Sequence, residues 1–348
     1  MSSQPVEVRP LPPEEDEARD VFVRTHPSGS FFHLAGWGNV IQRVFWHQRR
    51  DLGAWREDEL VGVLPMMRTP GLVGPGSLVS MPYGVYGGPI ATDPEAEAAL
   101  LAAAKSEAER ERVGHLELRY KDEPGNDMAS SDLYWTFVRE LPETEEEVLS
   151  RMPKKARAEA RKARDRHGLE LATGIWYLDD LQRLFVRNKH SLGSPGLPLQ
   201  LFQELRHEFG DDVQVHLVRR GGEPMAAVMT FRFGETLMAY YSGTAEGADR
   251  ACSASNFMYM ALQQWGVREG LRVFDFGRSR KDAGAFSFKA HQGFEAAPLA
   301  YRYHLVTSRA LPSFTPSNPK TALVRNIWKR LPHWMVQALS DRLARYLP

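Results

Sequence analysis

The sequence predicts an α/β (α+β) protein with two tandem domains, each a mixed, mostly antiparallel sheet flanked by helices. The chain has 348 residues, which is long for one domain and comfortable for two. Its hydrophobic share is 43% and its charged share 25%, so each half can bury a core. The predicted order of elements in the first half recurs in the second. Repetition of a whole order is stronger evidence than any single segment.

The second half shows this order most clearly. It predicts β-α-α-β-β-β-α-β-α-β over the segments Leu169–Gly174, Leu178–His190, Leu199–Phe209, Val213–Arg219, Met225–Phe233, Thr236–Ser242, Ser255–Glu269, Val273–Phe276, Phe286–His291 and Leu299–Val306. Gly221 and Gly222 indicate a hairpin turn between two of the strands. Gly270 is typical of the position just beyond a helix end.

The first half repeats most of this order. Its segments are Val6–Arg9, Glu14–Arg24, Trp37–Trp46, Leu52–Arg56, Leu60–Met66, Leu72–Ser80, Glu95–Arg112, Leu116–Arg119 and Trp135–Arg139. Two stretches also align by eye: Glu59–Leu64 with Glu223–Val228, and Arg112–Arg119 with Arg268–Asp275. Two unrelated α/β domains remain the alternative.

The boundary between the halves falls near Leu141 and Pro142, ahead of an acidic stretch suited to a helix start. We therefore expect an N-terminal domain at 1–141, a C-terminal domain at 142–307 that opens with a basic helix, and a basic amphipathic tail at 308–348.

The basic helix follows Pro153. Residues 151–166 contain eight Lys/Arg and two acids. A small-residue stripe at helical spacing should face the protein: Ala156, Ala160 and Ala163. Cations flank it on both sides: Lys154, Arg157, Arg161 and Arg164, and Lys155, Lys162 and Arg166. This arrangement suits a phosphate-bearing partner, such as an RNA acceptor stem or a pyrophosphate. A solvated helix whose charges only confer solubility is the alternative.

A loop and helix near residue 280 form the most specific segment. A buried strand runs into Gly277, and the loop that follows carries the cations Arg278, Arg280 and Lys281. Gly284 then opens a short helix whose free N–H groups suit an anion or a developing oxyanion. Lys289 lies about one turn inside this helix, between the expected core anchors Phe286 and Phe294. An ordinary exposed lysine is the alternative for Lys289.

Composition narrows the choice of partner, compartment and cofactor. Lys+Arg and Asp+Glu both number 44, so net charge indicates no polyanionic partner. One cysteine, Cys252, cannot form an internal disulfide, which favours a reducing compartment. Residues 1–20 lack the features of a secretory leader, and no run approaches a spanning helix. The scattered histidines indicate no metal site, and we expect no bound cofactor. The single cysteine and the missing leader favour a cytoplasmic protein.

Several motifs resemble one family. Gly277–Ser279, with Phe286–Lys289 and Gly293–Phe294, strongly resembles the C-terminal signature of FemAB-type transferases, above all the subgroup associated with exosortase (PEP-CTERM) envelope systems. The stretches that also resemble the family are Phe31–Trp37, Tyr86–Ile90, Met152–Arg157, Asn318–Lys320 and Trp328–Pro332. The resemblance covers nearly the whole chain.

The resemblance implies two tandem GNAT-like domains and transfer of an amino acid from aminoacyl-tRNA to an amine of a peptidoglycan precursor. It implies a role in acyl transfer for Lys289. The residues that it places near phosphate-bearing partners are Lys154, Lys155, Arg157 and Arg161. The chain lacks the long helical arm of the tRNA-using members.

The acyl donor is therefore aminoacyl-tRNA or acyl-CoA. GNAT enzymes hold the CoA pyrophosphate on a glycine-containing loop before a long helix, and the matching stretch here, 248–256, has no glycine. Arg250 and Ser253 keep the CoA interpretation open.

The remaining candidates concern proton transfer and substrate contact. Tyr240, Tyr241 and His291 are candidate bases for the attacking amine, whereas Asp275 is more typical of a structural strand residue. Tyr83 and Tyr86, on the glycine-rich loop 81–89, are candidates for gripping substrate, with packed tyrosines as the alternative. Arg278, Ser279 and Gly284 are further donor-binding candidates.

The tail contains six Lys/Arg and one Asp between Lys320 and Pro348. An apolar face is expected from Trp328, Leu331, Trp334, Met335, Ala338, Leu339 and Leu343. Such a helix can lie on an anionic membrane at the inner face, or it can pack on one of the domains.

Three functions follow from these observations. The first is acyl or aminoacyl transfer to an amine of a peptidoglycan or polysaccharide precursor. The second is acyl-CoA-dependent N-acetyl transfer, and the third is non-catalytic binding of an envelope precursor.

Overall fold

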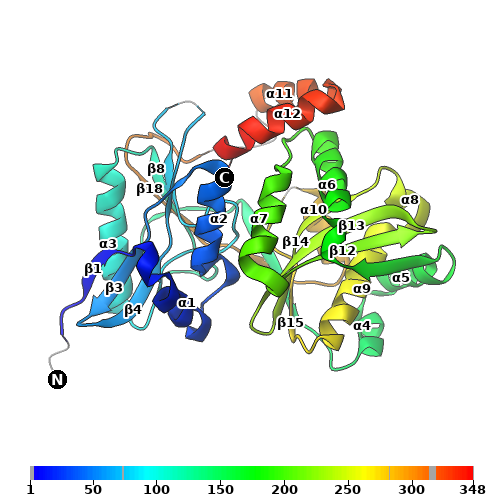
Figure 1. Cartoon of the computed structure of the whole chain (residues 1–348), viewed down its shortest axis with the longest axis horizontal. Coiled ribbons are helices and arrows are strands. Elements are labelled where there is room, and N and C mark those ends of the chain that lie inside the picture. Colours follow the sequence, from blue (N-terminus) through cyan, green and yellow to red (C-terminus); the bar gives the residue numbers. More distant parts are fainter. Residues whose placement is uncertain (1–3, 73, 282, 313–318, 348) are drawn as a thin grey trace. The chain divides into compact units, whose positions relative to one another are not determined.

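The computed structural model describes residues 4–72, 74–281, 283–312 and 319–347, with the side chains of the last segment from Arg325 onward. The chain divides into two compact units. Unit 1 contains residues 1–132, 299–313 and 345–348, and unit 2 contains residues 133–298 and 314–344. Figure 1 labels their elements.

Several helices follow one another in pairs with no strand between them. The α-helices are α1 (Asp16–Thr25), α2 (Ala35–Phe45), α3 (Pro94–Arg110), α4 (Glu145–Arg151), α5 (Lys154–Asp165), α6 (Leu178–Leu192), α7 (Leu199–Phe209), α8 (Ala248–Cys252), α9 (Ala254–Arg268), α10 (Gly284–His291), α11 (Pro319–Arg330) and α12 (His333–Leu343). Short 3-10 turns lie at Pro13–Glu15, Phe31–His33, Ile175–Tyr177, Gly210–Asp212 and Ala344–Tyr346.

Each predicted strand segment overlaps a strand, but six further short strands in the described residues were not predicted: Gln48–Arg49, Met67–Thr69, Ile90–Ala91, Ala129–Ser131, Ser279–Arg280 and Ala296–Pro298. The strands are β1 (Glu7–Pro10), β2 (Gln48–Arg49), β3 (Leu52–Arg56), β4 (Glu59–Leu64), β5 (Met67–Thr69), β6 (Ser77–Val79), β7 (Ile90–Ala91), β8 (His115–Arg119), β9 (Ala129–Ser131), β10 (Tyr134–Glu140), β11 (Leu169–Thr173), β12 (Val213–Arg220), β13 (Glu223–Phe233), β14 (Thr236–Thr244), β15 (Val273–Asp275), β16 (Ser279–Arg280), β17 (Ala296–Pro298) and β18 (Tyr301–Leu305). The pairings are antiparallel except for β6 with β8 and β14 with β15. The expected mixed, mostly antiparallel sheets flanked by helices are confirmed.

In unit 2, helices cover both faces of the sheet. Neighbouring residues of β14 point to opposite faces, as in any strand. The ring of Tyr241 lies 5.8 Å from that of Phe185 in α6. Ser242 Oγ lies 3.3 Å from the hydroxyl of Tyr259 in α9. Thus α6 packs on one face and α9 on the other, as Figure 1 also shows.

The described residues form three sheets, and two strands pair outside the expected domain limits. We expected Trp135–Arg139 to complete the N-terminal sheet, but β10 pairs with β15, β16 and β17 of unit 2. We expected Leu299–Val306 to complete the C-terminal sheet, but β18 pairs with β8 of unit 1. Sequence order does not reveal this exchange, because either strand offers the same alternating pattern to either sheet.

The core of unit 2 contains the alanine stripe of α5, as predicted. Ala156, Ala160 and Ala163 are buried in the same cluster as Ala254 and Met258 of α9. None of the described helices is long and apolar enough to cross a membrane.

Candidate functional site

The candidate site lies in unit 2, where two parallel strands part. β14 and β15 pair as far as Met238 and Asp275. β14 then continues to Thr244, whereas β15 ends. A register shift against β13 places Tyr240 in a β-bulge, since Met229 faces Tyr241 and Thr230 faces Ala239. Bulges are common beside active sites because they redirect side chains.

The chain turns sharply after β15. Gly277 has φ +65°, a left-handed conformation that favours glycine. Its N–H donates to Asp275 Oδ1 at 2.6 Å, so Asp275 has the structural part that its strand position indicated. A Cβ on Gly277 would lie 3.7 Å from the ring of Tyr240, which places the turn against the bulge.

Lys289 holds this turn from inside. Its side chain is buried, and Nζ donates to the carbonyl oxygens of Phe276 at 2.6 Å, Gly277 at 2.9 Å and Arg278 at 3.2 Å. Burial lowers its pKa to about 7, against the opposing effect of the Asp275 carboxylate. Because an ammonium has three N–H donors, all of them are engaged. The exposed alternative for Lys289 is therefore wrong, and its contact with an oxyanion stays a prediction.

The other predicted residues of this segment surround the turn. Arg278 lies over the ring of Tyr134, with its guanidinium carbon 4.6 Å from the centroid. Ser279 is buried, and its Oγ has no hydrogen-bond partner among the described residues. Gly284 begins α10 and is exposed, whereas His291 is exposed at its other end. His291 follows Lys289 by two residues and so lies on another face of the helix.

Tyr241 lies on the α6 side of the same splay. It is buried, and the rings of Phe185 and Phe202 contact it edge-on at centroid distances of 5.8 and 5.3 Å. The structure therefore brings Arg278, Ser279 and Lys289 together at one turn, whereas the described contacts of Tyr241 are with aromatic rings on the α6 side of β14.

Lys189 joins this group, although sequence reasoning missed it. It lies in the last turn of α6 and is partly buried, with Nζ 5.2 Å from the ring centroid of Phe185. Burial and the positive charge of Arg278 both lower its pKa. Among the described residues, no carboxylate or carbonyl forms a hydrogen bond or an ion pair with its ammonium. In the sequence it resembles any helix lysine, so no signal marked it.

Carboxylates occupy the start of α9. Asp249 accepts hydrogen bonds from the N–H of Ser255 at 2.7 Å and from its hydroxyl at 2.9 Å. Glu159, from α5, accepts from the hydroxyl of Ser253 at 2.6 Å. Both negative charges lie where a helix attracts an anion.

The basic helix α5 exposes most of its cations. Lys154, Lys155 and Arg161 are exposed, and Arg157 is half-buried with a long contact of 3.4 Å to the Ser150 carbonyl. No hydrogen bond or ion pair between described residues joins these four to Lys289.

Tyr83 and Tyr86 belong to unit 1 and are both buried. The Tyr83 hydroxyl lies 3.2 Å from Nε2 of His47, and its ring stacks on Phe45. Tyr86 contacts Phe32 edge-on. Both side chains are packed, as the alternative expects, and their contact with substrate stays a prediction.

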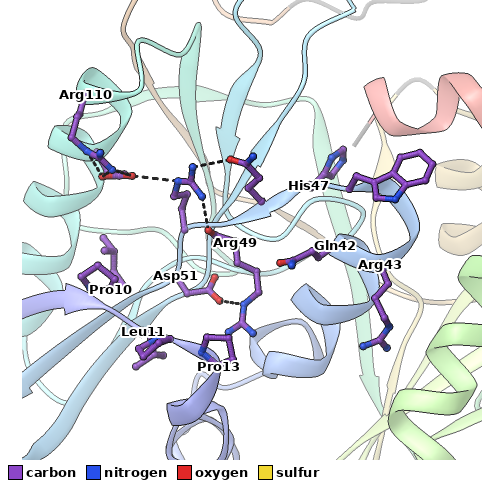
Figure 2. A pocket seen from close by; sticks show the side chains of 15 residues that line it. Pro10, Leu11, Pro13, Gln42, Arg43, His47, Arg49, Asp51 and Arg110 are labelled. Carbon is purple, nitrogen blue, oxygen red and sulfur yellow. Dashed lines mark hydrogen bonds and ion pairs between the residues drawn. The ribbon is translucent and has the colours of Figure 1, made fainter.

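Unit 1 also contains a pocket of about 900 Å³ at the end of α2. Figure 2 shows its side chains, among them Pro10, Arg49, Asp51 and Arg110. Its floor is an ion network: Asp51 accepts from buried Arg19 and from Arg49, each at 2.7 Å. None of the sequence-predicted site residues lines this pocket, and paired charges in its floor give it a structural explanation.

No group of three or more His, Cys, Asp or Glu within the described ranges could hold a metal ion.

Comparisons with known proteins identify the fold. Residues 150–290 match the family model described as acetyltransferase (GNAT) domain. No curated protein matches significantly.

Three solved structures resemble the chain. The structure of FemX has a TM-score of 0.67 at 14% identity, covering 86% of this chain and 98% of that one. L-PGS from Bacillus licheniformis has a TM-score of 0.55 at 15% identity, with 93% and 99% covered. A tandem GNAT protein from the clavulanic acid biosynthesis pathway has a TM-score of 0.54 at 12% identity, with 88% and 99% covered. The chain therefore carries a GNAT-type acetyltransferase domain at residues 150–290 within a fold similar to that of tandem GNAT proteins.

Proposed function

We propose that this chain is an acyltransferase of FemAB type that transfers an aminoacyl or acyl group to an amine of a peptidoglycan or polysaccharide precursor. The observation that carries this is the turn after β15 in a GNAT-type domain: Lys289 holds its carbonyl oxygens, and the charge of Arg278 lowers the pKa of Lys189. The similarity to the FemX fold supports the choice of class.

The chemistry needs an amine, an activated carbonyl and a place for negative charge. The amine nitrogen forms a bond to the acyl carbon, the bond from that carbon to the donor oxygen or sulfur breaks, and a proton passes from the amine to the leaving group. A positioned cation stabilises charged substrate groups without a change in its own geometry. Lys189 fits this role, because desolvation without a partner leaves its ammonium poised for an anion.

Lys289 acts as a positioning residue in this proposal. Its ammonium holds the carbonyls of Phe276, Gly277 and Arg278, and so sets the direction of the Arg278 side chain. Arg278 and Lys189 then bind the anionic part of donor or acceptor, a phosphate or a carboxylate.

The start of α9 favours a donor other than acyl-CoA. GNAT enzymes that use CoA need an open helix start for the pyrophosphate, and here Asp249 caps that position while Glu159 lies beside it. Two carboxylates repel a pyrophosphate, so an aminoacyl ester such as aminoacyl-tRNA is the preferred donor.

Acyl-CoA-dependent transfer is the second candidate. The matched family is described as acetyltransferase, and the similar tandem GNAT protein was solved in a form described as being without AcCoA. Calorimetric titration with CoA and with an aminoacylated minihelix RNA separates the two. We expect heat of binding with the RNA and none with CoA; saturable CoA binding would favour the second candidate.

A further inference from the structure

The C-terminal helices α11 and α12 pack on the end of α6, within unit 2. Trp328, which we expected on a free apolar face, is buried, and its carbonyl oxygen lies 3.1 Å from Nε2 of His190. Ser340 Oγ accepts a hydrogen bond from the N–H of Gly196 at 3.0 Å. The tail is therefore part of the folded unit, and only its outer side can meet a partner.

Large apolar side chains remain on that outer side. The exposed fraction is 72% for Trp334, 54% for Ile327 and 59% for Leu192 at the end of α6. Two contacts bring these segments together. A Cβ on Gly193 would lie 2.9 Å from Arg325, and the rings of His190 and His333 stack at 6.0 Å.

Cations surround these side chains. Lys329 and Arg330 are exposed on α11, and exposed Arg187 lies near enough to His333 to lower its pKa. The exposed acid on α12 is Asp341, two turns beyond Trp334. We call this surface the tail patch: Arg187, Leu192, Ile327, Arg330 and Trp334.

We propose that the tail patch docks the protein on an anionic lipid bilayer. Tryptophan favours the headgroup region, and isoleucine and leucine favour the acyl boundary just below it. Lysine and arginine side chains are attracted by the negative potential of an anionic lipid surface. An RNA partner would use the cations and the indole, but it gains nothing from exposed Ile327 and Leu192. The proposal is independent of the proposed function.

Vesicle co-sedimentation tests it with the full chain. We expect binding to phosphatidylglycerol–phosphatidylcholine vesicles that is at least tenfold stronger than to pure phosphatidylcholine. Point variants are preferable to truncation, because truncation would uncover α6 as well. Two variants remove different parts of the patch: Ile327→Ser with Trp334→Ser, and Arg187→Glu with Arg330→Glu. Each should weaken binding at least tenfold.

Trp176 provides a matched control, since it is 73% exposed in unit 2 but lies outside the tail patch. Trp176→Ser should bind like the unchanged protein. Equal binding to both kinds of vesicle, or patch variants that bind as well as Trp176→Ser, would overturn the proposal. The proposal would also be overturned if light scattering showed a dimer that Trp334→Ser dissociates, because the patch would then join two copies of the chain.

Discussion

Nζ of Lys289 donates a hydrogen bond to the carbonyl oxygen of Phe276 at 2.6 Å, and two further carbonyl oxygens accept its other hydrogen bonds. Lys289, the lysine of the family signature, therefore stabilises the turn after β15 from inside the fold. In the proposed function, the binding of the anionic group then depends on where this turn places Arg278, whose charge lowers the pKa of Lys189.

Replacement of Lys289 by Met should destabilise the fold as well as abolish turnover. Three buried carbonyls would lose their donor, and each unsatisfied group costs about 1–3 kcal/mol, partly offset by the removal of a buried charge, so we expect a net loss of about 2–4 kcal/mol. Urea unfolding measures this. Lys289→Met that keeps its unfolding midpoint while losing turnover would show that the ammonium acts directly on the reacting groups.

Replacement of Lys189 by Met should lower turnover without lowering stability, unlike the replacement of Lys289. Removal of a desolvated cation without a partner leaves stability unchanged or raises it. A charge-assisted contact to substrate is worth about 1.5–3 kcal/mol, so kcat/KM should fall about 10- to 100-fold.

Arg183→Met is the matched control on the same helix, because Arg183 is about half exposed and pairs with Asp180. It should keep full kcat/KM. Lys189→Met with normal kcat/KM would remove Lys189 from the site.

Replacement of the two carboxylates at the start of α9, Asp249 and Glu159, should lower stability and allow CoA to bind. Asp249→Ala removes a helix cap, which costs about 1 kcal/mol. Glu159→Gln with Asp249→Asn removes both charges and retains similar shapes, so weak CoA binding should appear where the unchanged protein has none. If the double variant binds CoA no better than the parent, the carboxylates are not what excludes it.

Acid should destabilise the protein through buried neutral histidines. Burial lowers the pKa of His33 and His47 to about 4 and that of His216 to about 3. Between those values and about 6.5 the unfolded chain binds protons that the native chain does not. The free energy of unfolding therefore decreases by about 1.4 kcal/mol for each histidine and for each unit by which the pH is lowered.

His216→Gln isolates the contribution of one of these histidines to the pH dependence of stability. His216 lies between the hydroxyls of Thr173 and Thr230, both at 2.9 Å. Between pH 4 and 6.5, where His216 is neutral when folded, the variant's stability should change by about 1.4 kcal/mol per unit less than the parent's. An unchanged slope would mean that native His216 already carries a proton in that range.

Sequence periodicity predicted most of this fold because it depends on local signals. The alanine stripe of α5 and the turn at Gly277 are examples, since helical spacing and a left-handed residue leave marks in the sequence. The pairing of β10 with β15 leaves no such mark, because strand partners are chosen by tertiary packing.

The site was predictable only in part. Lys289 was found through motif resemblance, but its direction toward Phe276 depends on how the turn folds. Lys189 was missed because its importance lies in the absence of a described acidic partner, which one sequence cannot reveal.

A mass-shift assay on a purified envelope precursor pool tests the central proposal most directly. The parent protein and Lys189→Met are each supplied with aminoacyl minihelix RNA or with acetyl-CoA. We predict an aminoacyl mass increment with the RNA, none with acetyl-CoA, and a rate at least tenfold lower for Lys189→Met. An increment from acetyl-CoA alone, or equal rates for the two proteins, would contradict the account.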